Sequence, residues 1–138
     1  DIIYGFLRDE VQYKPCHGCG KQIALTPDGM VGPCQAYLGT KKYFSSLKKY
    51  PDKKTLRSND AFKKWNEISM YRCEQCRKCF LLPVCPGDCP YDWENRCGSL
   101  FEVPDSYCLS RKTMFDYMIK RKVSGKSILF RPEISRNE

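Results

Sequence analysis

The hydrophobic pattern predicts a β-hairpin over residues 22–31. Two short apolar stretches there flank the turn sequence Thr-Pro-Asp-Gly at positions 26–29. Proline presets φ at the second position of such a turn, and Gly29 accepts the positive φ that the turn requires. Because a hairpin brings its two ends together, we expect Cys19, which precedes it, and Cys34, which follows it, to become neighbours.

Two helices are predicted further along the chain. Ser58 or Asn59 can cap the first helix, and its apolar residues recur at helical spacing, which favours a core role over a base-stacking surface. These apolar-face residues are Phe62, Trp65 and either Ile68 or Ser69. The second helix is expected over residues 110–123. Its buried stripe would consist of Met114, Phe115, Met118 and Ile119.

The rest of the pattern is irregular. Residues 36–57 mix apolar and lysine positions and break at Pro51. Prolines and a glycine exclude long helices and strands between Cys73 and Cys97. These breakers are Pro83, Pro86, Gly87 and Pro90. We therefore expect a small cysteine-rich α+β fold, built from a β-hairpin, irregular cysteine loops and two or three helices.

Length and composition fit one compact domain, or one domain with a tail. Only 41% of the 138 residues are hydrophobic and the mean hydropathy is −0.58, so the core should be modest. We expect the domain at residues 16–123 and the tail at 124–138. Because the chain starts at Asp1 rather than Met, residues 1–15 would be a leading segment or linker from a missing N-terminal domain. The apolar residues of that segment, which would pack on the missing part, are Ile2, Ile3, Tyr4, Phe6 and Leu7.

The charge balance is strongly basic, with a formal net charge of +8. Much of the surplus lies in residues 41–64 and 111–131, and such runs can meet nucleic acid, a membrane surface or an acidic peptide. A solvated basic face is the simpler interpretation of each run taken singly. No stretch is long or apolar enough to span a membrane, and we expect a soluble, cytoplasmic protein.

The ten cysteines carry the chemistry. Cys76, Cys79, Cys85 and Cys89 spell C-x2-C-x5-C-x3-C, and Cys73 lies one further C-x2-C step upstream. Four thiols within fourteen residues are spaced to converge on a metal ion or an iron–sulfur cluster. Zinc stays open here, because spacing alone does not separate zinc from iron and sulfide.

Disulfides are another use for an even number of cysteines. The tight run of thiols that starts at Cys73, the absence of a signal peptide and the lack of an N-glycosylation sequon argue against them. The single histidine, His17, lies beside Cys16, where thiols already suffice as ligands. We therefore interpret it as a loop histidine.

The cysteine pattern resembles that of the SPASM domain, the C-terminal auxiliary-cluster extension of radical S-adenosylmethionine (SAM) enzymes that modify peptides and proteins. The matching order is Cys19, nine residues, Gly29, four residues, Cys34, a gap, the motif from Cys76 to Cys89, a second gap and Cys108. The turn at 26–29 and the Gly-Pro-Cys sequence that ends at Cys34 belong to the same resemblance, which covers residues 16–108.

The resemblance implies two 4Fe–4S clusters, with zinc as a possible substitute. The first cluster would be held by Cys16, Cys19, Cys34 and Cys89. The second would be held by Cys76, Cys79, Cys85 and Cys108. Cys73 and Cys97 fall outside the pattern, and we interpret them as free thiols, with additional or alternative ligation as the other possibility.

By the same resemblance, the chain would be the auxiliary domain of a larger oxidoreductase that matures peptides or proteins through electron transfer. Such an enzyme needs a C-x3-C-x2-C motif for SAM, and here Cys85-x3-Cys89 begins correctly but the third position is Asp92. The chain alone should therefore not be catalytic, and SAM would enter only through the missing catalytic domain. The implied partners are that catalytic barrel, a peptide or protein substrate and an acidic electron carrier.

One alternative keeps zinc in place of the clusters. The chain would then be a cysteine-rich interaction module whose basic face contacts nucleic acid, with Tyr43, Phe44 or Tyr71 stacking on bases. Under the first interpretation, neither nucleic acid nor a membrane is a partner.

Overall fold

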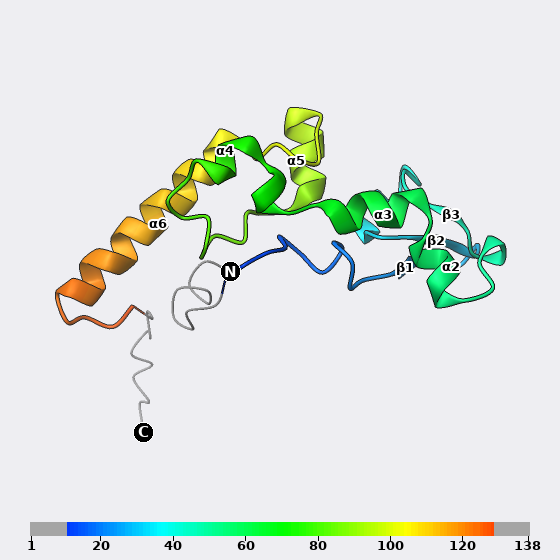
Figure 1. Ribbon diagram of the computed structural model, residues 1–138, viewed down its shortest axis with the longest axis horizontal. Helices are drawn as coiled ribbons and strands as arrows, with labels where there is room; N and C mark the ends of the chain where they lie inside the picture. Colours follow the sequence, from blue (N-terminus) through cyan, green and yellow to red (C-terminus); the bar gives the residue numbers. More distant parts are fainter. Residues whose placement is uncertain (1–10, 129–138) are drawn as a thin grey trace, which may run out of the picture.

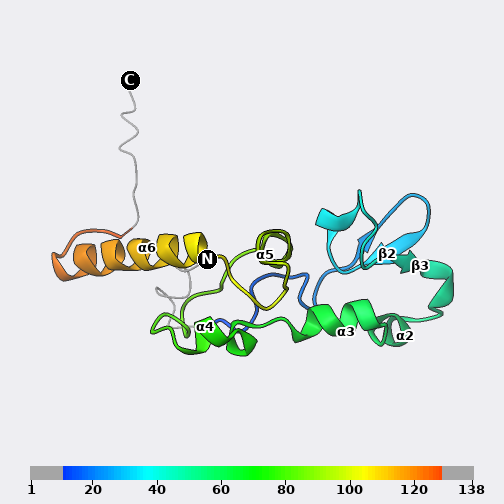
Figure 2. The same cartoon turned by 90° about the horizontal axis from the view of Figure 1, so that it is seen from above.

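The computed structural model describes residues 11–128 and has the expected α+β architecture in an elongated arrangement (Figure 1). A small antiparallel sheet lies at one end with helices α2 (Lys53–Arg57) and α3 (Asp60–Glu67). Helix α6 (Asp105–Val123) extends at the other end, and α4 (Glu74–Arg77) and α5 (Pro90–Cys97) lie between them (Figure 2).

Two sequence-based expectations fall partly or wholly outside the described residues. The apolar residues of the leading segment, Ile2, Ile3, Tyr4, Phe6 and Leu7, lie outside the described residues, and so do residues 129–138 of the expected tail. Over residues 11–128, the helices are all too short or too polar to cross a bilayer.

The predicted hairpin is confirmed. Strand β1 (Ala24–Leu25) pairs antiparallel with β2 (Met30–Gly32), and Gly29 in the turn has a φ of +74°. Strand β3 (Ser45–Ser46) was not predicted and pairs antiparallel with the other edge of β2, which gives the order β1-β2-β3. The central strand β2 therefore leads straight into Cys34 with a partner on each side.

The cap of α3 is also as predicted. The side chain of Asn59 accepts a hydrogen bond of 2.8 Å from the backbone N–H of Ala61. Phe62 and Trp65 are buried, which confirms the core interpretation, and the third buried residue of this face is Ile68, just past the helix end. Helix α2 was not predicted. It begins after Pro51, where Asp52 caps it through a 2.7 Å hydrogen bond from the N–H of Thr55.

The cysteine loop contains more helix than its prolines led us to expect. No helix or strand runs through residues 80–88, in keeping with Pro83, Pro86 and Gly87. Pro90, however, begins α5 instead of breaking regular structure. At the first position of a helix the missing N–H of proline has no partner to lose, and its fixed φ is already helical.

Helix α6 begins five residues earlier than the predicted 110–123, at Asp105 after Pro104. The expected stripe is present, with Met118 fully buried and Met114 and Phe115 packed around Leu81. Ile119, the fourth residue of the expected stripe, is half-buried. Tyr107 and Cys108 in the first turn lie seven residues before Met114 and Phe115, but they pack against the buried group around Trp93 instead of around Leu81. The earlier start places Cys108 on the helix, and the cysteine site depends on this.

Thiols form part of the hydrophobic core. The largest buried group contains Trp65 and Trp93, and Cys19, Cys34 and Cys73 pack among them. Short 3₁₀ turns at residues 35–37, 47–49 and 70–72 complete the chain path around this core. Because the core is partly made of thiols, the packing of the domain and the occupancy of its cysteines are physically linked.

Candidate metal centres

Four of the ten thiols surround one cavity of about 130 Å³. They come from three parts of the chain, since Cys76 lies on α4, Cys79 and Cys85 on the following loop, and Cys108 in the first turn of α6. Apolar side chains complete the wall, among them Met70, Leu81 and Val103. Soft thiolates in an apolar pocket form the donor set that iron–sulfur clusters use.

Electrostatics in this cavity favour neutral thiols in the absence of a cation. Burial raises the pKa of Cys85, and the nearby positive charge of Arg111 only partly opposes it. Burial also raises the pKa of Cys108, although a 3.6 Å hydrogen bond from the amide of Gln75 acts in the other direction. Iron or zinc would supply the positive charge that holds these sulfurs as thiolates, so ligand binding here is accompanied by proton release.

A second set of thiols lies at the core near Trp65. Cys16 and Cys19 face each other across a short turn, in which the N–H of Cys19 donates to the carbonyl of Cys16 at 3.2 Å. Cys34 reaches the same region after β2, and burial raises its pKa, with the neighbouring Cys16 and Cys89 adding to the effect. Cys89 is the residue directly before α5. Residues as distant in sequence as Cys34 and Cys89 are thus close enough to interact.

The turn between Cys16 and Cys19 holds two thiols in direct contact. Their hydrogen bond lowers the pKa of Cys16 to about 6 and raises that of Cys19. Because the thiolate is the form that binds metal, Cys16 is the more readily ionised thiol of this pair. His17 lies on this turn with an exposed side chain, in agreement with the loop interpretation.

The two cysteines outside the pattern have different surroundings. Cys73 is fully buried, its thiol is hydrogen-bonded to that of Cys76, and it donates to the carbonyl of Ser69 at 3.6 Å. It is therefore a fifth thiol beside the cavity. Cys97 lies at the far end of α5, where its charged neighbours are Glu102, Asp105 and Arg96.

All ten cysteines lie within the described residues, and all are free thiols. In residues 11–128, no three cysteine, histidine or acidic side chains meet at the spacing of a single metal ion. The four thiols of the cavity instead line a space that is larger than the site of a single ion.

Buried donors without partners test whether a cluster fits these sites. Within the described residues, the indole N–H groups of Trp65 and Trp93 and the Nε–H of Arg111 are buried and have no hydrogen-bond acceptor. Trp65 packs with Cys19 and Cys34, and Arg111 lines the cavity. Buried donors normally have partners, and cluster sulfurs accept hydrogen bonds from such groups. The donors and thiols therefore fit an iron–sulfur cluster.

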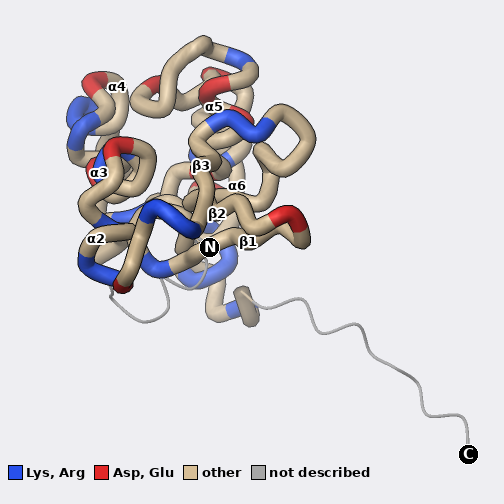
Figure 3. The backbone as a smooth tube through the Cα atoms, turned by 90° about the vertical axis from the view of Figure 1, so that its right-hand side faces the viewer, with Lys and Arg blue, Asp and Glu red and all other residues tan. Residues whose placement is uncertain are grey.

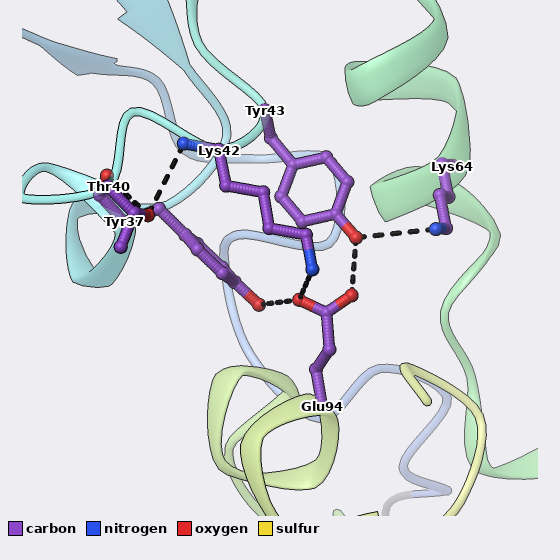
Figure 4. A network of polar contacts seen from close by, with 6 residues as sticks. All are labelled: Tyr37, Thr40, Lys42, Tyr43, Lys64 and Glu94. Atoms are coloured by element: carbon purple, nitrogen blue, oxygen red, sulfur yellow. Dashed lines mark hydrogen bonds and ion pairs between the residues drawn. The ribbon is translucent and has the colours of Figure 1, made fainter. Parts of the chain in front are cut away.

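Sequence reasoning missed a polar network that joins the two thiol-bearing segments of the first set (Figure 4). The Glu94 carboxylate on α5 accepts hydrogen bonds of 2.6 Å from Tyr37 and from Tyr43 and forms a 3.0 Å ion pair with Lys42. Lys64 donates to the hydroxyl of Tyr43 at 3.3 Å. No local pattern signals these contacts, because each joins residues far apart in sequence.

The aromatic residues considered for base stacking are partly buried and have partners within the protein. Tyr43 bonds to Glu94, and Phe44 packs against the core. Tyr71 stacks on Tyr13 with ring centroids 5.4 Å apart. All three residues that the nucleic-acid alternative would use for stacking therefore make contacts within the chain.

Two kinds of enzyme are similar in sequence to this chain. No protein-family model matches the chain. It is 25% identical over 126 residues, 91% of its length, to the radical SAM cyclopropyl synthase TigE of Paramaledivibacter caminithermalis. It is 26% identical over 106 residues, 77% of its length, to the cysteine-type anaerobic sulfatase-maturating enzyme of Clostridium perfringens, in two strains.

The similarity is to one segment of each relative. The chain spans about a quarter of the length of these relatives, 25% of the synthase and 28% of the maturating enzymes. This supports a radical SAM-associated domain.

Proposed function

We propose that the chain is an auxiliary iron–sulfur domain of a larger radical SAM enzyme that modifies a peptide or a protein. The observation that carries this proposal is the convergence of Cys76, Cys79, Cys85 and Cys108 on one cavity. Their spacing resembles the SPASM pattern, and the relatives include a radical SAM cyclopropyl synthase and sulfatase-maturating enzymes. A packing role alone would not explain four thiols around a space that apolar side chains could fill.

Two 4Fe–4S clusters are proposed. The second cluster would be held by the four thiols of the cavity, and the first by Cys16, Cys19, Cys34 and Cys89. Cys85 and Cys89 are four residues apart and would bind different clusters. This crossed ligation would hold the two clusters at a fixed distance from each other. When bound, the clusters supply one-electron chemistry at potentials that surrounding charges, hydrogen bonds and exposure set.

The chain's own residues define the environment of that chemistry. Trp65 and Trp93 are fully buried and pack in the same group as Cys19 and Cys34. Gly87 lets the loop pass close to Trp93, since a Cβ there would lie 2.8 Å from the indole ring and its φ is +73°. Packing of this kind around a metal site controls the access of solvent and therefore influences the reduction potential of the site.

The catalytic part and the substrate belong to the proposal as partners. The radical SAM barrel would bind SAM, and the cysteines of this chain would hold the clusters that supply one-electron chemistry during modification of the peptide. An acidic electron carrier would suit the basic segment 41–64, which holds nine Lys and Arg against two Asp. Figure 3 views the chain from this end and shows Lys and Arg around α2 and β3.

The test of this proposal is metal and sulfide content. The chain is purified and reconstituted with iron and sulfide without oxygen, and its visible spectrum is recorded. We expect about eight irons and about eight sulfides per chain, with a broad brown absorption. Stoichiometric zinc that iron and sulfide cannot displace would overturn the electron-transfer role and favour a zinc-stabilised binding module.

A further inference from the structure

One ion pair connects helix α6 to the loop that carries the cysteines. Arg111 lies three residues after Cys108, nearly one turn further along the helix, and it lines the thiol cavity. Its guanidinium donates a 2.8 Å hydrogen bond to the carboxylate of Asp88. Both side chains are mostly shielded, at 24% and 29% exposed, so this is not an ordinary surface pair.

Asp88 lies between the two thiols that the proposed function assigns to different clusters, Cys85 and Cys89. Its other carboxylate oxygen accepts a 3.0 Å hydrogen bond from the backbone N–H of Cys89. One oxygen of the Asp88 carboxylate therefore holds the backbone of the loop, and the other holds the guanidinium of Arg111. Since the arginine side chain is planar, holding one of its terminal nitrogens also orients the rest of the group.

Part of the guanidinium has no partner in the chain. Within the described residues, the Nε–H of Arg111 is buried and makes no hydrogen bond, although its terminal nitrogen is paired. A buried charged donor without an acceptor is unfavourable. The side chain stands at the wall of a cavity lined by four thiols, and the charge of Arg111 acts on Cys85.

We propose that Arg111 is a positioning residue for an iron–sulfur cluster in this cavity, donating its Nε–H to a cluster sulfur and raising the cluster's reduction potential. This inference rests on the proposed function. Reduction adds one negative charge to a cluster, and a nearby fixed cation with a hydrogen bond to sulfur stabilises the reduced state more than the oxidised state. Asp88 acts through Arg111 by keeping the guanidinium at the cavity.

The test compares midpoint potentials in the reconstituted chain. Arg111→Gln removes the charge and the fork-shaped donor, whereas Arg111→Lys keeps the charge and removes the planar Nε–H. Arg121→Gln is the matched control, because it removes one positive charge from the same helix where Arg121 bonds to the carbonyl of Ser127 instead. Potentials are measured by redox titration followed by electron paramagnetic resonance.

We expect one of the two midpoint potentials to become more negative in R111Q, to shift less in the same direction in R111K, and to stay unchanged in R121Q. If R111Q does not retain the second cluster, the midpoint potentials of R111K are compared with those of R121Q instead. Equal potentials in R111K and the wild type would overturn the Nε–H hydrogen bond. A shift in R121Q as large as that in R111Q would overturn the local role.

Iron and sulfide analysis separates this inference from the proposed function. A wild-type chain that binds only zinc removes the proposed function and this inference with it. A wild-type chain that holds two clusters, with R111Q unchanged in both potentials, leaves the proposed function standing and overturns the role of Arg111 alone.

Discussion

The hydroxyl of Tyr37 donates a 2.6 Å hydrogen bond to the carboxylate of Glu94, across 57 positions of sequence. Tyr37 follows Cys34 by three residues, and Glu94 lies in the helix that begins directly after Cys89. This bond therefore fixes the distance between two segments that carry thiols of the first set. The glutamate side chain is only 10% exposed, so little solvent weakens it.

Replacing Glu94 by glutamine should destabilise the domain. The change removes the negative charge that Tyr37, Tyr43 and Lys42 share, and hydrogen bonds to a charged group contribute more than neutral ones. We expect a loss of about 2 kcal/mol in the free energy of unfolding, measured by denaturant titration without oxygen. Glu67→Gln is the control, since its ion pair with Arg72 is exposed and should cost less than about 1 kcal/mol. Equal losses in the two variants would contradict this role of Glu94.

The same glutamate should give the domain an acid-dependent stability. Burial raises the pKa of Glu94, but hydrogen bonds from Tyr37, Tyr43 and Lys42 outweigh burial and hold the pKa below its ordinary value of 4.5. A depressed carboxyl pKa stabilises the fold above the unfolded value and loses that contribution as the pH falls through the folded value. The gap in stability between the wild type and E94Q should therefore be constant near neutral pH and shrink below pH 4.5. A gap that widens in acid would show that another group dominates.

Trp65→Ala should be among the most damaging core changes. The indole is fully buried and makes edge contacts with Tyr37 and Tyr43 at centroid distances of 5.8 and 6.1 Å. Removing it leaves a cavity, and we expect a loss of about 3–5 kcal/mol in the free energy of unfolding. Phe80→Ala, at a ring that is 70% exposed, should cost far less. If both aromatic deletions had similar effects, the core would not be centred on Trp65.

Local chemistry explains which parts of the fold were predictable. The hairpin follows from the turn at Gly29, and α3 follows from the Asn59 cap and the spacing of its apolar residues. Strand β3 has only two residues, and its existence depends on pairing with β2, so no pattern within it could reveal it. The sequence predicts Pro90 to be a helix breaker, because sequence alone does not show whether a proline stands at the first position of a helix or inside it.

The cysteines of the candidate site could be picked out from their spacing in the sequence, whereas the side chains around them could not. Four cysteines in the motif and Cys108 were recognisable because their order resembles a known pattern. The partners Asp88 and Arg111 lie next to predicted ligands, yet nothing in the sequence says that they meet. Contacts of this kind arise only when the helix and the loop have packed, so they follow from tertiary structure.

Cys108 and Cys97 offer a matched pair for the cluster assignment. Cys108→Ala removes one wall of the thiol cavity, and we expect iron in the reconstituted chain to fall from about eight to about four atoms. Cys97→Ala changes a thiol at the far end of α5 and should leave the iron content unchanged. Both values come from iron and sulfide analysis beside the visible spectrum. A loss of iron in Cys73→Ala, with C108A unaffected, would instead assign the ligand role to the buried thiol beside the cavity.

The basic segment 41–64 should control association with an acidic electron carrier. Lys53 and Lys54 on α2 are exposed, and among the described residues neither has an ion-pair partner. Replacing both by glutamate should slow association with a small acidic flavoprotein about tenfold at low salt, because opposite charges steer the encounter. The control is the same change at Lys122 and Lys126, near the far end of α6. Stopped-flow rates should converge as salt screens the charges. Rates that are insensitive to salt, or equally slow in both double variants, would rule out docking at this segment.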